Sequence, residues 1–249
     1  MISLKTKEEA KKMRRSGEIA AFAINQLVRE VRVGITTLEL DKIAKRLIEA
    51  RGAKSAFLDY NGYNYTICVS INDEVVHGLP SSRQIKDGDI VSIDLGVLYN
   101  GYFADTAKSV IVGNATVEAK RVVFGVKEAL EAAIKEARPG VKIGDIENAS
   151  GEVLKKHGLS AVMALSGHGI GTQIHEEPSI KSDGTRGTGE TVKAGMVFAL
   201  EPMATIGSGD VFTAPDGWTV KSKDQSIAAH FEHTVLIAEN GAKILTKAH

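Results

Sequence analysis

The stretch IVSIDLGVLYNGYFAD, residues 90–105, decides the fold. Asn100-Gly101 separates two runs that are rich in Val, Ile and aromatic residues, which favour β-strands. Asn-Gly is a strong hairpin signal because a type I′ turn needs a positive φ at both of its central residues. With the turn at these two residues, Gly96 lies opposite Asp105. The sequence therefore predicts a hairpin of two long antiparallel strands.

The same register brings two acidic residues to one face of the hairpin. Asp94 lies diagonal to Asp105, and the Cβ atoms of diagonal neighbours are about 7 Å apart. Two carboxylates that converge inside a sheet are unfavourable unless a cation lies between them. The alternative is an amphipathic strand from which one of the two acids points to solvent. The many apolar residues around both acids favour convergence on a cation.

Further acidic residues and histidines extend this candidate site. Glu201 ends an apolar run, Glu232 leads into another, and His168 lies between glycines that let the backbone approach a neighbour closely. His77 and His175 each stand beside a glycine or an acidic pair. Each residue also has a simpler interpretation, because a Glu can cap a strand and a His is more often structural than catalytic.

Taken together, three or four acids and at least one histidine, without a thiolate, indicate an oxygen-rich site for two metal ions. Carboxylate and imidazole ligands suit Mn²⁺, Fe²⁺, Co²⁺ or Zn²⁺. Bridging carboxylates hold two such ions about 3.5–4 Å apart, and the pair activates water and polarises a carbonyl group. The reaction that this site favours is hydrolysis.

Helical and strand-like patterns occur in the same order in both parts of the chain. Gly34 and Gly52 follow two predicted helices, and Gly140 and Gly158 follow two more at the same spacing. This spacing suggests an internal duplication, although any two helical hairpins can share it. The expected helices cover residues 8–31, 37–51, 118–137 and 145–156, and the expected strands cover 67–71, 90–99, 102–112, 197–200, 218–220 and 231–237. We expect one α+β domain over residues 1–249, built from two similar halves of about 1–112 and 113–249.

Composition excludes several classes of protein. The chain has 249 residues, of which 43% are hydrophobic and 25% are charged, as in globular proteins. Its 31 basic and 31 acidic residues balance, which argues against a general attraction to nucleic acid or to an acidic membrane surface. The single cysteine, Cys68, allows no internal disulfide. With no signal peptide or membrane span in the sequence, we expect a cytoplasmic protein.

The chain closely resembles type I methionine aminopeptidases, which have the pita-bread metallopeptidase fold. The similarity runs nearly from end to end, and the ordered set of motifs is far more specific than any one of them. The motifs that carry it are Val75–Gly78, Lys86–Asp94, Asp105-Thr106, Gly167–Gly171, His175–Pro178, Leu200–Pro202, Asp216–Val220 and Phe231–Thr234.

The resemblance implies a fold, a ligand set and catalytic residues. The fold is α+β with two pseudo-symmetric halves, in which helices pack on a curved antiparallel sheet. Two divalent ions (Co, Mn, Fe or Zn) are expected, with Asp105 and Glu232 bridging them. His77 and His175 are expected to contact the substrate, and Glu201 to transfer the proton of the attacking water. The implied metal ligands are Asp94, Asp105, His168, Glu201 and Glu232.

The resemblance also implies a pocket for the methionine side chain. Four of the aromatic residues of the chain fall within nine positions, Phe57 to Tyr65, and a thioether packs favourably against aromatic faces. Trp218, the only tryptophan, stands in a polar setting that is unlike a core position. Phe57 and Ile174 replace the cysteine and phenylalanine that are more usual, so we expect a reshaped pocket. The expected substrate-binding residues are Phe57, Tyr60, Tyr63, Cys68, His77, Ile174, His175 and Trp218.

The resemblance thus implies a monomeric enzyme that removes the N-terminal methionine of nascent polypeptides or peptides. It favours a small second residue and acts by attack of a metal-bridging hydroxide on the first peptide bond. Transient contact with the ribosome is compatible with this function, whereas no membrane or specific nucleic-acid partner is expected. One alternative is a peptidase of the prolidase or aminopeptidase P kind, which usually carries an additional N-terminal domain. The other is a non-catalytic binding module on the same fold, against which the complete ligand set argues.

Overall fold

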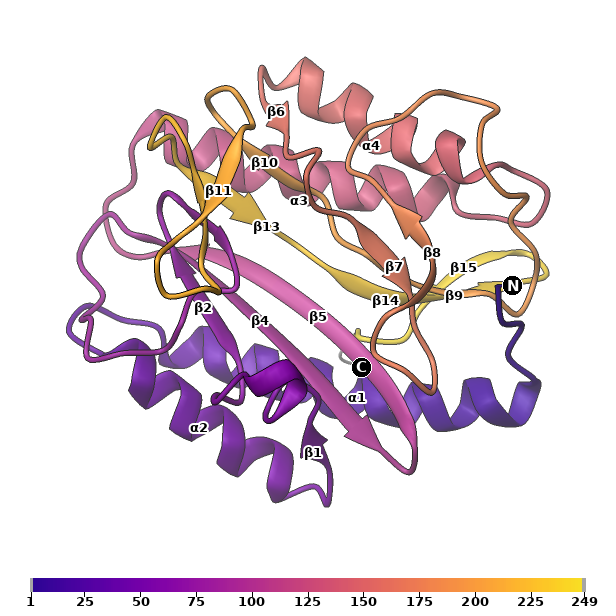
Figure 1. Cartoon of the computed structure of the whole chain (residues 1–249), viewed down its shortest axis with the longest axis horizontal. Coiled ribbons are helices and arrows are strands. Elements are labelled where there is room, and N and C mark those ends of the chain that lie inside the picture. The colour runs from indigo at the N-terminus through magenta and orange to yellow at the C-terminus, as the bar shows by residue number, and fades with distance from the viewer. Residues whose placement is uncertain (1, 248–249) are drawn as a thin grey trace.

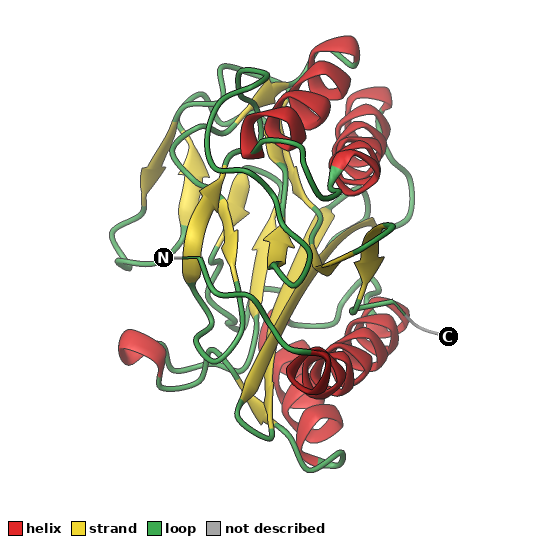
Figure 2. Cartoon of the chain, turned by 90° about the vertical axis from the view of Figure 1, so that its right-hand side faces the viewer, coloured by secondary structure: helices red, strands yellow, loops and turns green. Residues whose placement is uncertain are grey.

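Two pairs of helices enclose the strands of the molecule in the computed structural model, which describes residues 2–247 (Figure 1). One pair packs together at each end of the molecule, and the strands lie between the pairs (Figure 2). The helices are α1 (Lys7–Glu30), α2 (Thr37–Glu49), α3 (Val117–Glu136) and α4 (Ile143–Lys156). Within residues 2–247, none of them combines the length and the apolar character needed to cross a membrane.

The predicted helices are confirmed, with a difference at the start of the fourth. The first three begin after a threonine whose side chain accepts a hydrogen bond from the backbone N–H three residues later: Thr6, Thr36 and Thr116. The fourth begins at Ile143, two residues before its predicted start. The carboxylate of Asp145 accepts a hydrogen bond of 2.7 Å from the backbone N–H of Lys142, so Asp145 lies within the first turn.

The strands form four small antiparallel sheets. The sheet orders are β1-β4-β2 with β5 beside β4, β13-β10-β6, β11-β12-β3 and β15-β14-β9-β7-β8. The strands are β1 (Lys54–Ser55), β2 (Cys68–Ile71), β3 (Glu74–Val76), β4 (Ile90–Tyr99), β5 (Tyr102–Ile111), β6 (Ser160–Ala161), β7 (Gly167–Gly169), β8 (Glu176–Ile180), β9 (Val197–Leu200), β10 (Met203–Thr205), β11 (Val211–Thr213), β12 (Val220–Ser222), β13 (Ala228–His230), β14 (His233–Ala238) and β15 (Gly241–Ile244).

The hairpin predicted from residues 90–105 is confirmed in its register. Gly96 pairs with Asp105 across β4 and β5. Asn100 has a φ of 49° and Gly101 a φ of 80°, as a type I′ turn requires. Asp94 pairs with Ala107, so it lies diagonal to Asp105 as expected.

Two predicted strands begin later than expected. The strand expected at 218–220 begins at Val220, because Asp216 Oδ1 accepts hydrogen bonds of 2.8 Å from the backbone N–H groups of Trp218 and Thr219 and holds both in a turn. The strand expected at 231–237 begins at His233. Residues 231 and 232 instead link β13 to β14 and contact β5.

Each half buries its own hydrophobic cluster, and the halves meet along β5. One cluster is built from residues between 19 and 112, and the other almost entirely from residues between 119 and 237. At the junction, the backbone N–H of Glu232 donates to the carbonyl of Ala107 (2.9 Å), and the backbone N–H of Asp105 donates to Thr234 Oγ1 (2.8 Å). We call this junction the seam; it comprises β5 and residues 230–234.

Substitution of Phe198 tests how much packing at the centre of the second cluster contributes to the stability of the fold. Phe198 has no exposed surface, whereas Phe124 on α3 is 60% exposed. We expect Phe198→Ala to lower the free energy of unfolding by about 3–5 kcal/mol because it leaves a cavity. The matched variant Phe124→Ala should change it by less than about 0.5 kcal/mol. Urea denaturation followed by circular dichroism measures both, and equal losses would contradict the burial of Phe198.

Candidate metal centre

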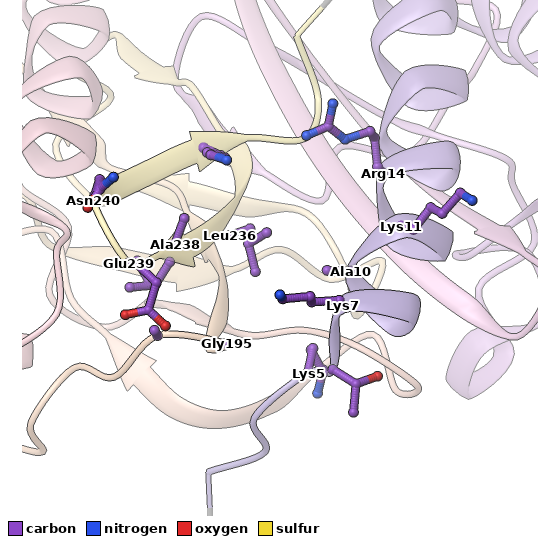
Figure 3. A pocket seen from close by; sticks show the side chains of 14 residues that line it. Lys5, Lys7, Ala10, Lys11, Arg14, Gly195, Leu236, Ala238, Glu239 and Asn240 are labelled. Atoms are coloured by element: carbon purple, nitrogen blue, oxygen red, sulfur yellow. The ribbon is translucent and has the colours of Figure 1, made fainter.

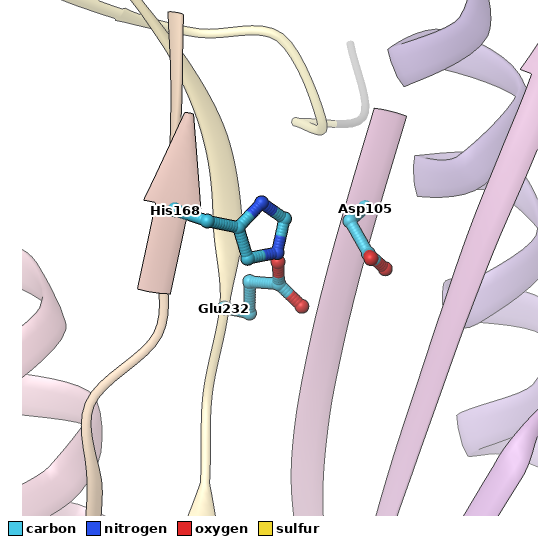
Figure 4. A group of neighbouring side chains, drawn as sticks. All are labelled: Asp105, His168 and Glu232. Atoms are coloured by element: carbon cyan, nitrogen blue, oxygen red, sulfur yellow. The ribbon is translucent and has the colours of Figure 1, made fainter. Parts of the chain in front are cut away.

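Three side chains from different elements point toward one another at the seam. Asp105 comes from β5, His168 from β7, and Glu232 from the link between β13 and β14 (Figure 4). Each offers one possible ligand atom, and these atoms lie within 4.8 Å of one another. Such a group of two carboxylates and an imidazole is typical of a site for a divalent transition-metal ion.

Asp94 and Glu201 complete the cluster that the sequence predicts. Asp94 lies on β4 beside Asp105, and Glu201 directly follows β9. Glu201 Oε1 lies 3.4 Å from Nε2 of His168. Burial raises the pKa of Asp94, and the nearby charges of Asp105 and then of Glu201 raise it further. The structure therefore brings all five predicted ligands into one neighbourhood.

Two of these carboxylates have an oxygen that lacks the hydrogen-bond partner a buried acid requires. Burial raises the pKa of Asp105 to about 7, and it raises the pKa of Glu201 and of Glu232 well above the usual value for a Glu. Among residues 2–247, Asp94 Oδ1 and Glu232 Oε1 have no hydrogen-bond partner although both are buried. Unpaired carboxylate oxygens that converge in the interior fit divalent cations, which would satisfy and neutralise them.

Hydrogen bonding fixes the tautomer of His168 that a metal site requires. Nδ1 of His168 donates a hydrogen bond of 2.8 Å to the carbonyl oxygen of Gly169, because that oxygen can only accept. Nε2, on the side of Glu201, is then free of its proton and can ligate. Burial and the neighbouring His175 lower the pKa of His168 to about 4, so its imidazole is neutral at pH 7.

Glycines allow the strands around His168 to approach one another. A Cβ at Gly167 would collide with the carbonyl of Ala199 on β9, and one at Gly169 would collide with the backbone of Glu177 on β8. The absence of side chains at both positions lets β7 lie close between its neighbours. This close packing presents His168 toward the acids.

A cavity of about 330 Å³ opens beside the cluster and has aromatic walls. Tyr63 and Trp218 contact each other edge to face, with ring centroids 5.0 Å apart. Of the predicted substrate-binding residues, the cavity is lined by Phe57, Tyr60, Tyr63, Cys68, His77, His175 and Trp218. Besides the predicted metal ligands, four further residues line it: Val76, Leu165, Ser166 and Met203. Leu165 and Ser166 belong to the stretch 163–166, whose departure from the usual family sequence bears on the dimensions of the pocket, whereas Val76 and Met203 were not predicted to line it.

Ile174 differs from the other predicted pocket residues in its place. Its side chain is buried. Ile174 is not among the described residues that line this cavity. A Cβ at Gly96 would lie 2.9 Å from Phe57 Cε1 and 3.3 Å from Ile174 Cδ1, so both side chains rest on this glycine of β4. Ile174 therefore supports the wall that Phe57 forms.

His77 and His175 line the cavity as neutral imidazoles. Burial lowers the pKa of both, and the nearby His175 lowers that of His77 further. His77 has a φ of 58°, a left-handed conformation that is uncommon for a residue with a Cβ. Such conformations concentrate at functional sites, where the surrounding structure enforces them.

His230 is a residue at the centre that the sequence did not assign. Its Nε2 lies 3.3 Å from Glu201 Oε2, so the carboxylate of Glu201 lies between His230 and His168. Burial and the nearby His77 lower the pKa of His230 to about 3. Its position two residues before Glu232 was the available signal, because alternate residues of an extended chain face the same side.

A larger cavity of about 680 Å³ lies between the start of α1 and the hairpin β14–β15 (Figure 3). Lys7, Lys11 and Arg14 line it from α1. Among the residues that the structure describes, its lining includes one acid, Glu239, and no histidine. The chemistry of the buried acids therefore assigns the reaction to the smaller cavity.

Comparisons with known proteins agree with this assignment. The family model "Metallopeptidase family M24" matches residues 11–239. Methionine aminopeptidase of Aquifex aeolicus is 43% identical over 99% of both chains, and that of Escherichia coli K12 is 40% identical over 98% of this chain and 94% of its own. The solved methionine aminopeptidase of Thermotoga maritima has a TM-score of 0.98 and 41% identity, covering 99% of this chain and all of its own. The prolidase of Pyrococcus furiosus has a TM-score of 0.80 and 30% identity, over 99% of this chain and 66% of its own.

Removal of one carboxylate tests whether the cluster binds metal. We expect Asp105→Asn to weaken the binding of Mn²⁺ at least about 100-fold, since even the loss of an outer partner of a ligand weakens metal binding about 10–100-fold. Isothermal titration of the metal-free protein measures the affinity. Asp210→Asn is the control, because Asp210 is exposed and lies outside the lining of the cavity. Equal affinities of both variants would show that the metal binds elsewhere.

Proposed function

The chain belongs to metallopeptidase family M24 and is a metal-dependent enzyme that removes methionine from the amino ends of polypeptides, and we propose that five side chains beside the aromatic cavity hold its metal. Its structural neighbours share the pita-bread fold. The observation that carries the proposal is the convergence of four carboxylates, three of them buried, and one imidazole beside a cavity with aromatic walls.

The charge of the cluster favours two ions over one. Asp94, Asp105, Glu201 and Glu232 would carry four negative charges when ionised, and two divalent cations would balance them. His168 is the imidazole ligand in this proposal. Mn²⁺, Fe²⁺, Co²⁺ and Zn²⁺ all suit the donor set. When bound, such ions supply a Lewis acid for the peptide carbonyl and lower the pKa of bound water.

The side chains around the cavity have distinct roles in the proposal. Glu201 takes a proton from the attacking water at a carboxylate oxygen and delivers it to the leaving amine. Its position at the edge of the cavity, between two imidazoles, supports this role. His77 and His175 donate hydrogen bonds to the substrate backbone and to the oxygen that becomes negative as the bond breaks. Both line the same cavity, and neither is ionised at neutral pH.

The aromatic cavity accommodates the methionine side chain in this proposal. Its walls combine Tyr63, Trp218 and Phe57 with the thiol of Cys68, which is buried. A flexible thioether gains favourable contacts with the faces and edges of aromatic rings. We extend the proposal to a preference for a small second residue, which rests on the resemblance to methionine aminopeptidases.

Several finer features of the proposal also rest on that resemblance. Nascent polypeptides are the proposed source of substrate, with transient contact to the ribosome. The enzyme would then act in the cytoplasm, as one polypeptide chain forming a single catalytic domain. A proline-directed activity is less favoured, because the prolidase aligns with a TM-score of 0.80 against 0.98 for a methionine aminopeptidase.

Peptide cleavage after metal depletion tests the function. We expect protein treated with a chelator to lose activity on Met-Ala-Ser, and re-addition of Mn²⁺, Co²⁺, Fe²⁺ or Zn²⁺ to restore it, because the buried acids bind the water-activating ions. Release of free methionine, measured by chromatography, is the readout. A peptide that begins with Ala-Pro is the matched substrate for the alternative activity. Cleavage of Ala-Pro without cleavage of Met-Ala-Ser would overturn the assignment, and full activity after strong chelation would overturn the metal mechanism.

A further inference from the structure

Tyr60 contacts His175 directly at the mouth of the cavity. The hydroxyl oxygen of Tyr60 lies 2.8 Å from Nδ1 of His175, and the two rings pack at a tilt with their centroids 5.4 Å apart. Tyr60 belongs to the short 3-10 helix η1 (Tyr60–Gly62), and His175 precedes β8. The contact therefore joins the wall of the substrate pocket to a residue of the reaction site.

The backbone around His175 is held independently of Tyr60. The next residue, Glu176, accepts hydrogen bonds from the backbone N–H groups of Thr172 (2.9 Å) and Gln173 (3.2 Å). Lys5 Nζ lies 2.6 Å from Glu176, and its side chain is only 4% exposed. Because these contacts fix the loop, the remaining freedom of His175 is the rotation of its ring.

The imidazole ring of His175 has neighbours on two sides. The ring of His168 meets it edge to face, with centroids 4.4 Å apart. Tyr60 adds the hydrogen bond at Nδ1. Packing alone does not distinguish the two nitrogens of a neutral imidazole, whereas a hydrogen bond at one of them does.

The backbone of η1 is shaped to present Tyr60. Asp59 has a φ of 67° and Asn61 a φ of 50°, so the residues on both sides of Tyr60 adopt the left-handed conformation. Such conformations persist where the surrounding structure enforces them, and they are frequent at functional sites. Hydrogen bonds of 2.8 Å and 3.0 Å between the backbones of Asp59, Tyr60 and Tyr63 close this turn.

The chemistry of the two groups decides the direction of the hydrogen bond. A phenol is a stronger donor than a neutral imidazole N–H, and an imidazole nitrogen is a stronger acceptor than a phenol oxygen. Tyr60 therefore donates its O–H to Nδ1 of His175. The single proton of the neutral ring then resides on Nε2, the nitrogen that Tyr60 leaves free.

We propose that Tyr60 is a positioning residue that fixes the tautomer and orientation of His175, so that His175 donates its Nε2–H to the carbonyl oxygen of the substrate. This inference rests on the proposed function, in which His175 binds that oxygen. It gives Tyr60 a role beyond that of a pocket wall. The methionine side chain of the substrate would pack beside Tyr60, the residue that orients His175. Tyr60 would therefore contribute both to recognition of the substrate and to the reaction.

The variant Tyr60→Phe isolates this role, because it keeps the ring in the pocket and removes only the hydroxyl group. We expect kcat on Met-Ala-Ser to fall about tenfold, the effect of losing one net hydrogen bond at the reaction site. KM should change less than about twofold, since the wall of the pocket is retained. The matched control is Tyr102→Phe, which removes a hydroxyl bonded to Glu9 at the surface of α1 and should leave both constants unchanged. An unchanged kcat in Tyr60→Phe, or a loss confined to KM, would overturn the proposal.

A spectroscopic measurement separates this proposal from the proposed function. In Zn²⁺-loaded protein labelled with ¹⁵N-histidine, the signals of His175 are identified by their absence in His175→Gln. We expect an unprotonated Nδ1 and a protonated Nε2 in the parent protein, and a mixture of both tautomers in Tyr60→Phe. The same tautomer in both proteins would overturn the role of Tyr60. Failure of the parent protein to cleave Met-Ala-Ser would instead overturn the proposed function, and the tautomer measurement would still decide the role of Tyr60.

Discussion

The convergence of four carboxylates, two at the seam and one each from β4 and from the end of β9, is the constraint on which the rest of the structure depends. Taking these groups out of water raises the pKa of each, and mutual repulsion opposes the ionisation of Asp94, Glu201 and Glu232 further. The fold therefore has to supply the energy that brings them together. It does so with two hydrophobic clusters and with hydrogen bonds along β5 that do not involve the acids themselves, such as those between Ser109 and the backbone of His230.

At the seam, one set of groups holds the strands in register and another set carries the negative charge. Hydroxyl groups of Thr106, Ser109 and Thr234 satisfy the backbone between the two halves, so the strands stay in register without the carboxylates. Within the described residues, Asp94 and Glu232 are each left with one unpaired oxygen, which a cation can bind. Neutral imidazoles surround this negative cluster, because their own burial disfavours the protonated form. The site thus concentrates negative charge for metal and keeps uncharged donors for the substrate.

Local signals predicted the parts of the structure that local chemistry determines. The Asn100-Gly101 turn predicted the register of β4 and β5, and the structure confirms it. The starts of three helices are likewise local, because the structure shows a threonine cap before each of them. The late start of β12 follows from a local turn, in which Asp216 accepts hydrogen bonds from the backbone N–H groups of Trp218 and Thr219. The late start of β14 depends on the link of residue 232 to β5, a contact between residues that are distant in sequence. The convergence of His168, Glu201 and Glu232 on the hairpin was expected from the motifs of a family. Periodicity alone could not place them, because the strands that carry them pair across long distances in sequence. The position of His230 two residues before Glu232 was a local signal for its presence at the centre, but its contact with Glu201 joins residues that periodicity does not pair.

The distribution of the acids along the chain has a consequence for synthesis. The proposed ligands begin at Asp94 and end at Glu232, and the loop before β8 is pinned by Lys5 from the other end of the chain. A ribosome releases residues from the amino end onward, so the first half emerges with two acids on a hairpin whose partner strands do not yet exist. The proposed centre can close only after Glu232 has emerged. Assembly of the proposed centre therefore follows the synthesis of β13 and of Glu232, and a chain that terminated before Glu232 would lack one of the proposed ligands.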